Sequence, residues 1–243
     1  ITSAFDFKKE RNWIDWFYRF DIAKFETLLK TKPESFWQKA GERRALELFH
    51  SMAERVPAYN DFLKKNKISH KEIKTIRDFQ KTVPLTDKKN YIQVYTLKQR
   101  CWDGKMNHSI VPASSGTSGE PTFWPRGGFQ EFEAAVIHEL IYNGIFGANK
   151  RKTLALIGFP MGVYVSGVAT ALPTWLVAGK GNNLTLMSIG NNKNEMLRAV
   201  KNLSNDYEQV ILIGHPFFIK DVVETGVENN ISWRKMNVRM MFC

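Results

Sequence analysis

The chain has 243 residues, of which 43% are apolar or aromatic and 24% are charged. This is the composition of a globular protein with enough hydrophobic surface for a core, so it excludes disorder or a coiled coil as a description of the whole chain. Two cysteines, Cys101 and Cys243, are too few for a disulfide framework, and no Cys-x-x-Cys pair is present to bind zinc. We therefore expect a reducing, cytoplasmic setting.

The formal net charge is +11, and most of the excess lies in the first part of the chain, where residues 1–105 carry 23 basic and 14 acidic side chains. The lysines are spread along expected solvent-facing helix surfaces and do not gather with aromatic residues on one face. This pattern argues against a nucleic-acid partner. A positive field favours an anionic small ligand such as a nucleotide. The sequence carries no signal for an oligomeric state.

The first 105 residues are expected to form a helical region, because apolar residues recur there at helical spacing. Trp13, Trp16, Phe17 and Phe20 form one stripe, and a second runs from Ala45 to Val56 and stops at Pro57. Such stripes are typical of packing surfaces. Charges at Asp6 and Lys8 interrupt any early apolar run, so no signal peptide is expected.

Residues 106–243 alternate between strand-like and helix-like segments. The expected strands are 108–113, 153–159, 184–189, 210–213 and 238–242, and the expected helices are 129–146, 163–178, 193–203 and 216–228, with Asn191 as the N-cap of the third helix. Repetition of strand, helix and strand predicts an α/β fold, a mostly parallel sheet flanked by helices. We interpret 106–243 as a nucleotide-binding subdomain that is truncated, because the chain stops on a strand.

One uncharged stretch, from Thr153 to Gly179, is long enough to test as a membrane span, which needs about 20 apolar residues. Pro160, Pro173 and the glycines at 158 and 162 break it into two shorter lengths. The pattern favours a buried strand followed by a buried helix, so no membrane partner is expected.

The segment from Ser114 to Gly119 has the composition of a phosphate-binding loop. It contains four hydroxyl side chains and two glycines, namely Ser114, Ser115, Gly116, Thr117, Ser118 and Gly119. Glycines let the backbone approach an anion, while successive N–H groups and hydroxyls donate to phosphate oxygens. The loop lacks the Gly-Lys-Ser/Thr ending of a Walker loop. A flexible Ser/Gly turn has the same composition and remains the alternative.

This run resembles the phosphate-binding loop of the adenylate-forming (AMP-forming) carboxylate ligases. The family pattern is two hydroxyl residues, Gly, two hydroxyl residues, Gly, any residue, Pro, then Lys or Thr, and Thr122 fills the last place as in the phenylacetate–CoA ligase branch. Glu120 occupies the free position, where that branch often has Lys. Residues 53–59, 73–79 and 83–88 are similar to the branch in order and spacing, and 158–164 stands where the family has a loop lining the carboxylate pocket.

The resemblance implies a two-step reaction, in which a carboxylate attacks the α-phosphate of ATP and coenzyme A then takes the acyl group from the adenylate. It implies that the loop residues 114–119 and Thr122 hold the β- and γ-phosphates with bridging Mg²⁺, and that Tyr164, His215 and Pro216 line the pocket of the small-molecule carboxylate. The family's later segments would lie beyond Cys243, so the chain is expected to be the N-terminal part of such an enzyme and inactive alone.

Other residue patterns predict no further catalytic or metal site. His138-Glu139 lacks a second His at position 142, which is Tyr, so the zinc protease motif fails and no metal ligand set is expected. Glu131 and Glu133 are expected to be solvated rather than a carboxylate dyad. Two further functions stay open: acyl transfer to a protein or saccharide acceptor, as in acyl-protein synthesis or capsule biosynthesis, and a non-catalytic α/β binding module.

Overall fold

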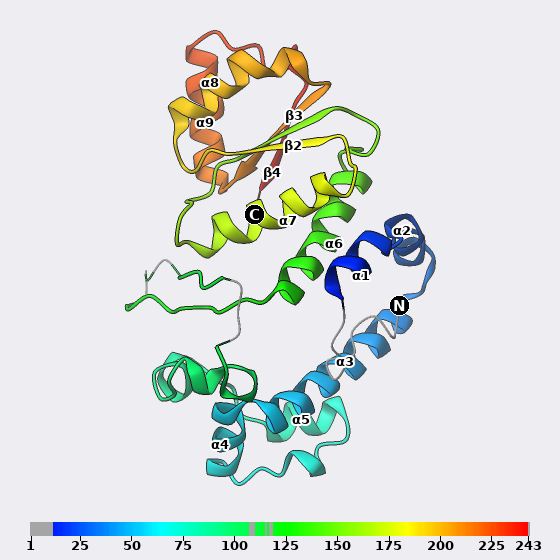
Figure 1. Cartoon of the computed structure of the whole chain (residues 1–243), viewed down its shortest axis with the longest axis vertical. Helices are drawn as coiled ribbons and strands as arrows, with labels where there is room; N and C mark the ends of the chain where they lie inside the picture. Colours follow the sequence, from blue (N-terminus) through cyan, green and yellow to red (C-terminus); the bar gives the residue numbers. More distant parts are fainter. Residues whose placement is uncertain (1–11, 107–109, 115, 117–118, 243) are drawn as a thin grey trace. The chain divides into compact units, whose positions relative to one another are not determined.

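The computed structural model describes residues 12–106, 110–114, 116 and 119–242. These residues fall into two compact units. One contains residue 12 and residues 27–106, and the other contains Trp13–Glu26 together with the described residues from 110 to 242. Figure 1 colours the chain from its N-terminus to its C-terminus.

The first unit is helical. Its elements are the second half of α2 (Ile22–Thr31), α3 (Glu34–Arg55), α4 (Pro57–Lys65), η1 (His70–Glu72), α5 (Ile76–Thr82), η2 (Lys88–Ile92), η3 (Lys98–Arg100) and η4 (Trp102–Gly104). Pro57 separates α3 from α4, because proline cannot continue a helix but fits its first turn. The buried core joins α3 and α4 to the later turns through Phe49, Phe62 and Tyr91.

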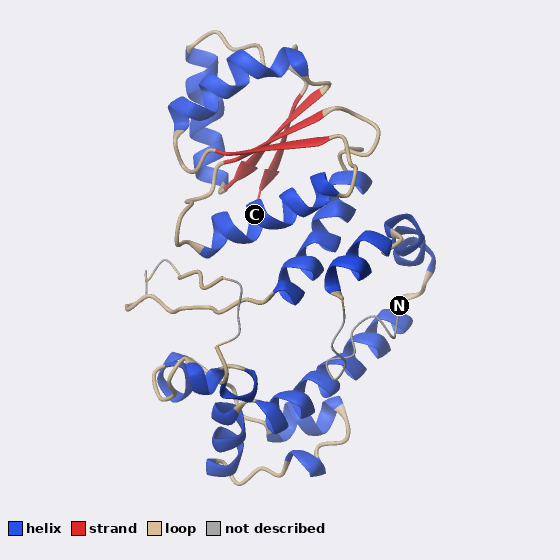
Figure 2. Ribbon diagram, in the orientation of Figure 1, coloured by secondary structure: helices blue, strands red, loops and turns tan. Residues whose placement is uncertain are grey.

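The second unit contains a four-stranded parallel sheet, whose strands are drawn in red in Figure 2. The strand order is β2-β1-β3-β4. The strands are β1 (Thr153–Ile157), β2 (Leu184–Ser188), β3 (Gln209–Gly214) and β4 (Val238–Phe242). All residues of β1 and β3 are buried, as expected for central strands covered on both faces. The predicted α/β fold with a parallel sheet is confirmed.

Helices cover both faces of this sheet, as Figure 1 shows. Ala155 and Ile157 face a core shared with α1 (Trp13–Arg19), α6 (Gly128–Gly144) and α7 (Val165–Gly179). Leu154 and Leu156 face a core shared with α8 (Lys193–Leu203) and α9 (Pro216–Glu228), next to η5 (Ser204–Asp206). The unit is therefore a three-layer sandwich.

The N-cap of α8 differs from the prediction by one residue. The side chain of Asn192, rather than that of Asn191, accepts a hydrogen bond from the backbone N–H of Glu195 at 3.2 Å. An N-cap side chain bonds the N–H three positions ahead, so the position of the first helical residue decides which asparagine can do it.

The uncharged stretch forms β1, a turn and α7. Among the residues that the structure describes, no helix combines the length and the apolar content that crossing a bilayer requires.

Candidate functional site

The candidate site is built at the carboxyl edge of the sheet, between β1 and β3. From β1 the chain passes through α7 to β2 on one side, and β3 lies on the other side of β1. The N–H of Gly158, just after β1, donates to the carbonyl oxygen of Ile213 in β3 at 2.7 Å. In open α/β sheets, ligands bind at such a switch point.

A hairpin outside the sheet carries the predicted phosphate loop. Ile110 and Arg126 exchange two backbone hydrogen bonds of 3.2 and 2.9 Å, and the N–H of Trp124 donates to the carbonyl oxygen of Pro112 at 2.9 Å. The predicted strand 108–113 is thus wrong in its described part, 110–113, which pairs with the segment 123–126 and joins no strand of the sheet. Pro112 has no N–H to donate to a sheet ladder.

Ala113 connects this hairpin to the segment that follows β1. Its N–H donates to the carbonyl oxygen of Val163 at 2.7 Å, and its carbonyl oxygen accepts from the N–H of Val165 at 3.1 Å. Tyr164 lies between these two partners. The structure therefore brings the base of the predicted phosphate loop next to Tyr164, although 50 residues separate Ser114 from Tyr164 in the sequence.

Within the loop, the predicted residues Ser115, Thr117 and Ser118 lie outside the described residues. The base is closed by Ser114, whose N–H donates to the carbonyl oxygen of Thr122 and whose hydroxyl oxygen accepts from the N–H of Thr122, both at 2.9 Å. Thr122 is buried.

The two glycines of the loop have positive φ angles, of 68° at Gly116 and 120° at Gly119. A Cβ at Gly116 would lie 2.9 Å from the carbonyl oxygen of Gly119, so this bend requires glycine. The N–H of Gly119 donates to the carbonyl oxygen of Gly116 at 2.9 Å. In this conformation a phosphate oxygen would have to replace that internal bond to engage the Gly119 amide.

The predicted pocket residues stand at the starts of the two helices that follow the adjacent strands β1 and β3. Tyr164 is the N-cap of α7 and is 42% exposed. His215 follows β3 as the N-cap of α9, and Pro216 is the first residue of that helix. The His215 ring stacks on Phe217 with centroids 5.5 Å apart, and both side chains are exposed. The carboxyl edge thus presents aromatic surface to solvent.

An ion pair beside the hairpin gave no signal in the sequence. The Arg126 guanidinium donates to Glu131, in the first turn of α6, with Nε 2.5 Å from Oε1. Glu131 is buried, so the prediction that it is solvated is wrong. From the sequence alone, a carboxylate in a helix is expected to face solvent. Only the structure shows that its cationic partner, here on the segment before the helix, allows it to be buried.

The His138-Glu139 pair, which fails the zinc protease motif, takes part in packing and in a buried ion pair. Glu139 is buried and pairs with Lys180 at 2.7 Å. Burial lowers the pKa of His138, whose Nδ1 lies 2.8 Å from the carbonyl oxygen of Ala134. In the described part of the chain, no three His, Cys, Asp or Glu side chains are grouped so that they could hold a metal ion.

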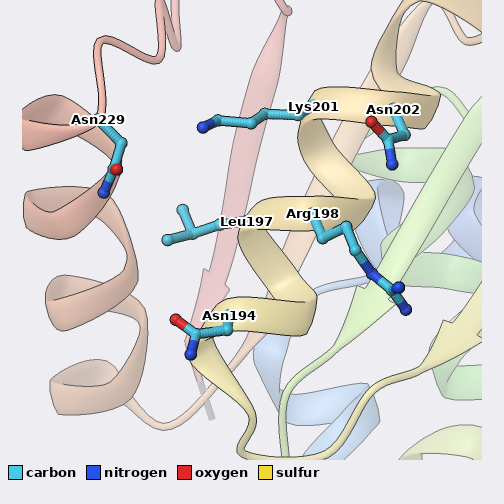
Figure 3. A pocket seen from close by; sticks show the side chains of 6 residues that line it. All are labelled: Asn194, Leu197, Arg198, Lys201, Asn202 and Asn229. Atoms are coloured by element: carbon cyan, nitrogen blue, oxygen red, sulfur yellow. The ribbon is translucent and has the colours of Figure 1, made fainter.

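A separate open hollow of about 320 Å³ lies between α8 and the end of α9 (Figure 3). Lys201 extends towards Asn229 across it, while Arg198 points away and pairs with Glu195. The lining contains none of the predicted site residues; it consists of Asn194, Leu197, Arg198, Lys201, Asn202 and Asn229.

No protein-family model and no curated protein sequence match this chain. Solved structures do, and three are of 2-hydroxyisobutyryl-CoA ligase. In complex with 2-HIB-AMP and CoA in the thioesterification state, that ligase matches with a TM-score of 0.77 and 15% identity over 99% of this chain and 50% of the ligase. In the postadenylation state with R3-HIB-AMP the TM-score is 0.75, at 14% identity over 99% and 49%.

The open conformation of the same ligase, in complex with 2-HIB-AMP and CoA, matches with a TM-score of 0.69 and 15% identity over 87% of this chain and 48% of the ligase. This chain thus spans about half the length of the structures that it resembles. At such low identity the likeness concerns the fold. The resemblance to adenylate-forming ligases is confirmed at that level: the chain has the fold of about half of such an enzyme.

Proposed function

We propose that this chain is the N-terminal part of an ATP-dependent, AMP-forming carboxylate–CoA ligase similar to phenylacetate–CoA ligase. The observation that carries the proposal is the pair of backbone hydrogen bonds at Ala113, which join the base of the predicted phosphate loop to the segment that contains Tyr164. An acyl-adenylate forms only where a carboxylate meets the α-phosphate of ATP. A loop for the phosphates and a pocket for the acid must therefore be neighbours.

In this proposal the loop holds the β- and γ-phosphates through Ser114, Ser115, Gly116, Thr117, Ser118, Gly119 and Thr122. Tyr164, His215 and Pro216 line the acid side of the site. The carboxylate oxygen attacks the α-phosphorus, and pyrophosphate leaves with the electron pair of the broken P–O bond. Such a reaction needs little covalent help from the protein and depends on positioning and on stabilisation of charge.

The described residues offer a limited set of ligands for Mg²⁺. Glu120 is an exposed carboxylate in the loop, and no group of three acidic or histidine side chains surrounds it within the described ranges. This fits the usual mode for Mg²⁺, which binds substrate phosphates with one or two carboxylates and retains waters. Bound there, Mg²⁺ would neutralise phosphate charge, and Glu120 is the residue of the loop that could contact it.

Coenzyme A is the proposed acceptor in the second step, in a cytoplasmic setting. Two of the matching ligase structures contain CoA together with 2-HIB-AMP. The alternative acceptors, a protein or a saccharide, are separated from CoA by incubating the activated acid with CoA and looking for a thioester. Transfer only to a macromolecular acceptor would replace this part of the proposal.

The test is carboxylate-dependent exchange of pyrophosphate into ATP by the full-length protein that contains this chain. Replacing Thr117 and Ser118 by Ala should abolish exchange, whereas the matched double variant of exposed hydroxyls, Thr185→Ala with Ser232→Ala, should retain it. Full exchange in the loop variant would remove the assigned phosphate site. ATP binding without exchange for any carboxylate would favour the non-catalytic binding module.

A further inference from the structure

The hairpin that carries the loop is held at both of its strands. Its first strand is bonded through Ala113 to Val163 and Val165. Its second strand ends at Arg126, which makes two backbone hydrogen bonds to Ile110 and an ion pair to Glu131 of α6. A two-stranded hairpin is only marginally stable in isolation, so its position depends on such attachments.

The ion pair is a rigid attachment because Glu131 belongs to the packed core layer. Its helix buries Ala135 and Val136 in the core beneath the sheet, and the Glu131 side chain is 8% exposed against 23% for Arg126. The second carboxylate oxygen, Oε2, is also buried and has no hydrogen-bond partner among the described residues. The buried Glu131 carboxylate therefore depends on Arg126 for its compensating charge. This charge-assisted hydrogen bond is strongest when the two side chains keep the observed contact.

We propose that Arg126 is a positioning residue for nucleotide binding: by pairing with Glu131 it fixes the second strand of the hairpin, and with it the Ser114–Thr122 closure of the phosphate loop. The inference rests on the proposed function. Arg126 acts through the backbone rather than by touching ATP. Small displacements of a binding loop are enough to matter, since about 1 Å of misplacement can cost a hundredfold in rate.

The first experiment measures hydrogen exchange in the chain itself and needs no activity. In the Arg126→Met variant, the amides of residues 124 and 126, which donate across the hairpin, should exchange about tenfold faster, the change expected when an anchor of this kind is lost. The control is Lys180→Met, which breaks another buried pair of α6, with Glu139. It should leave those two amides unchanged. Equal exchange in Arg126→Met and the wild type would overturn the inference.

The second experiment separates positioning from stability. In the double variant Arg126→Met with Glu131→Leu no unpaired charge is buried, so stability should return towards that of the wild type. The KM for ATP in the exchange reaction should stay raised by about tenfold, while the KM for the carboxylate changes little and Arg126→Lys recovers part of the loss.

If the double variant regains the wild-type KM for ATP, the pair is merely structural and the inference fails. If the wild-type protein shows no exchange with any carboxylate, it is the proposed function that fails. The hydrogen-exchange result then still decides whether Arg126 holds the hairpin.

Discussion

Lys180 should contribute more to the stability of the α/β unit than any surface lysine does. Its ammonium lies 2.7 Å from Oε2 of Glu139, donates to the carbonyl oxygen of Phe20 at 2.8 Å, and stands 4.9 Å from the centroid of the Phe17 ring. The two charged side chains are only 11% and 4% exposed. One cation thus ties the region just after α7 to α6 and to the end of α1.

The Lys180→Met variant keeps the apolar stem and removes the charge. It leaves the Glu139 carboxylate buried without its cation, which costs about 3–5 kcal/mol, out of a total stability of about 5–15 kcal/mol for a typical domain. The contact with Phe17 adds about 0.5–2 kcal/mol. Replacing both partners, in Lys180→Met with Glu139→Leu, should recover most of this loss, because an apolar pair of similar volume is often neutral.

Urea unfolding measures the effect as a shift of the midpoint at constant slope. The matched control is Lys220→Met, which breaks the exposed pair with Glu224, whose partners are 67% and 59% exposed. Its cost should stay below about 0.5 kcal/mol. If Lys180→Met cost no more than this control, the Lys180–Glu139 pair would be hydrated in solution and the reasoning from burial would be refuted.

Three further predictions concern the glycines Gly167 and Gly41, the buried Tyr91 and the loop carboxylate Glu120. A Cβ at Gly167 would lie 2.2 Å from the carbonyl oxygen of Pro160, so Gly167→Ala should destabilise the protein by about 1–3 kcal/mol in thermal melts, whereas Gly41→Ala, with open space around it inside α3, should stabilise it. Burial raises the pKa of Tyr91 to about 12. Its folded pKa thus exceeds the ordinary value of about 10, so the stability present below pH 10 should fall as the pH rises towards 12, by up to about 1.4 kcal/mol per pH unit. Urea midpoints measured over this pH range should fall less steeply in Tyr91→Phe, which has no phenol to titrate. Glu120→Lys should raise the Mg²⁺ concentration needed for half-maximal exchange by about two- to fivefold, because it removes the loop carboxylate that could contact the metal; an unchanged Mg²⁺ requirement would separate Glu120 from the phosphates.

The parts of the fold with strong periodic signals were predictable from the sequence. The predicted helices 193–203 and 216–228 and the predicted strand 238–242 coincide with α8, α9 and β4. The apolar run of β1 indicated a buried strand, because a strand exposed on one face would alternate with polar residues. These elements follow from local pattern, and their parallel pairing follows from the helices between them.

The hairpin was not predictable in the same way. The run 110–113 has the composition of a sheet strand. Its actual partner, 123–126, contains Pro125, is followed by two glycines and gives no strand signal of its own. The pairing of Ala113 with Tyr164 joins segments that are far apart in the sequence, so no local pattern predicts it. The burial of Glu131 was missed for the same reason, since helical periodicity does not show which cation a carboxylate meets.

The hairpin also changes how the proposed site would hold phosphate. A phosphate-binding loop that follows a sheet strand commonly leads into a helix, whose N-terminal N–H groups and dipole stabilise the negative charge of the phosphate. Here the next helix, α6, begins at Gly128, and its positive end already faces the Glu131 carboxylate and Gln130, whose Oε1 accepts from the N–H of Gly127 at 2.7 Å. The positive end of this helix thus already meets a carboxylate of the protein. We therefore expect the hydroxyls and amides of the loop to supply most of the protein's contacts with phosphate. They can keep one geometry only if Ala113 and Arg126 hold the hairpin beneath them in place.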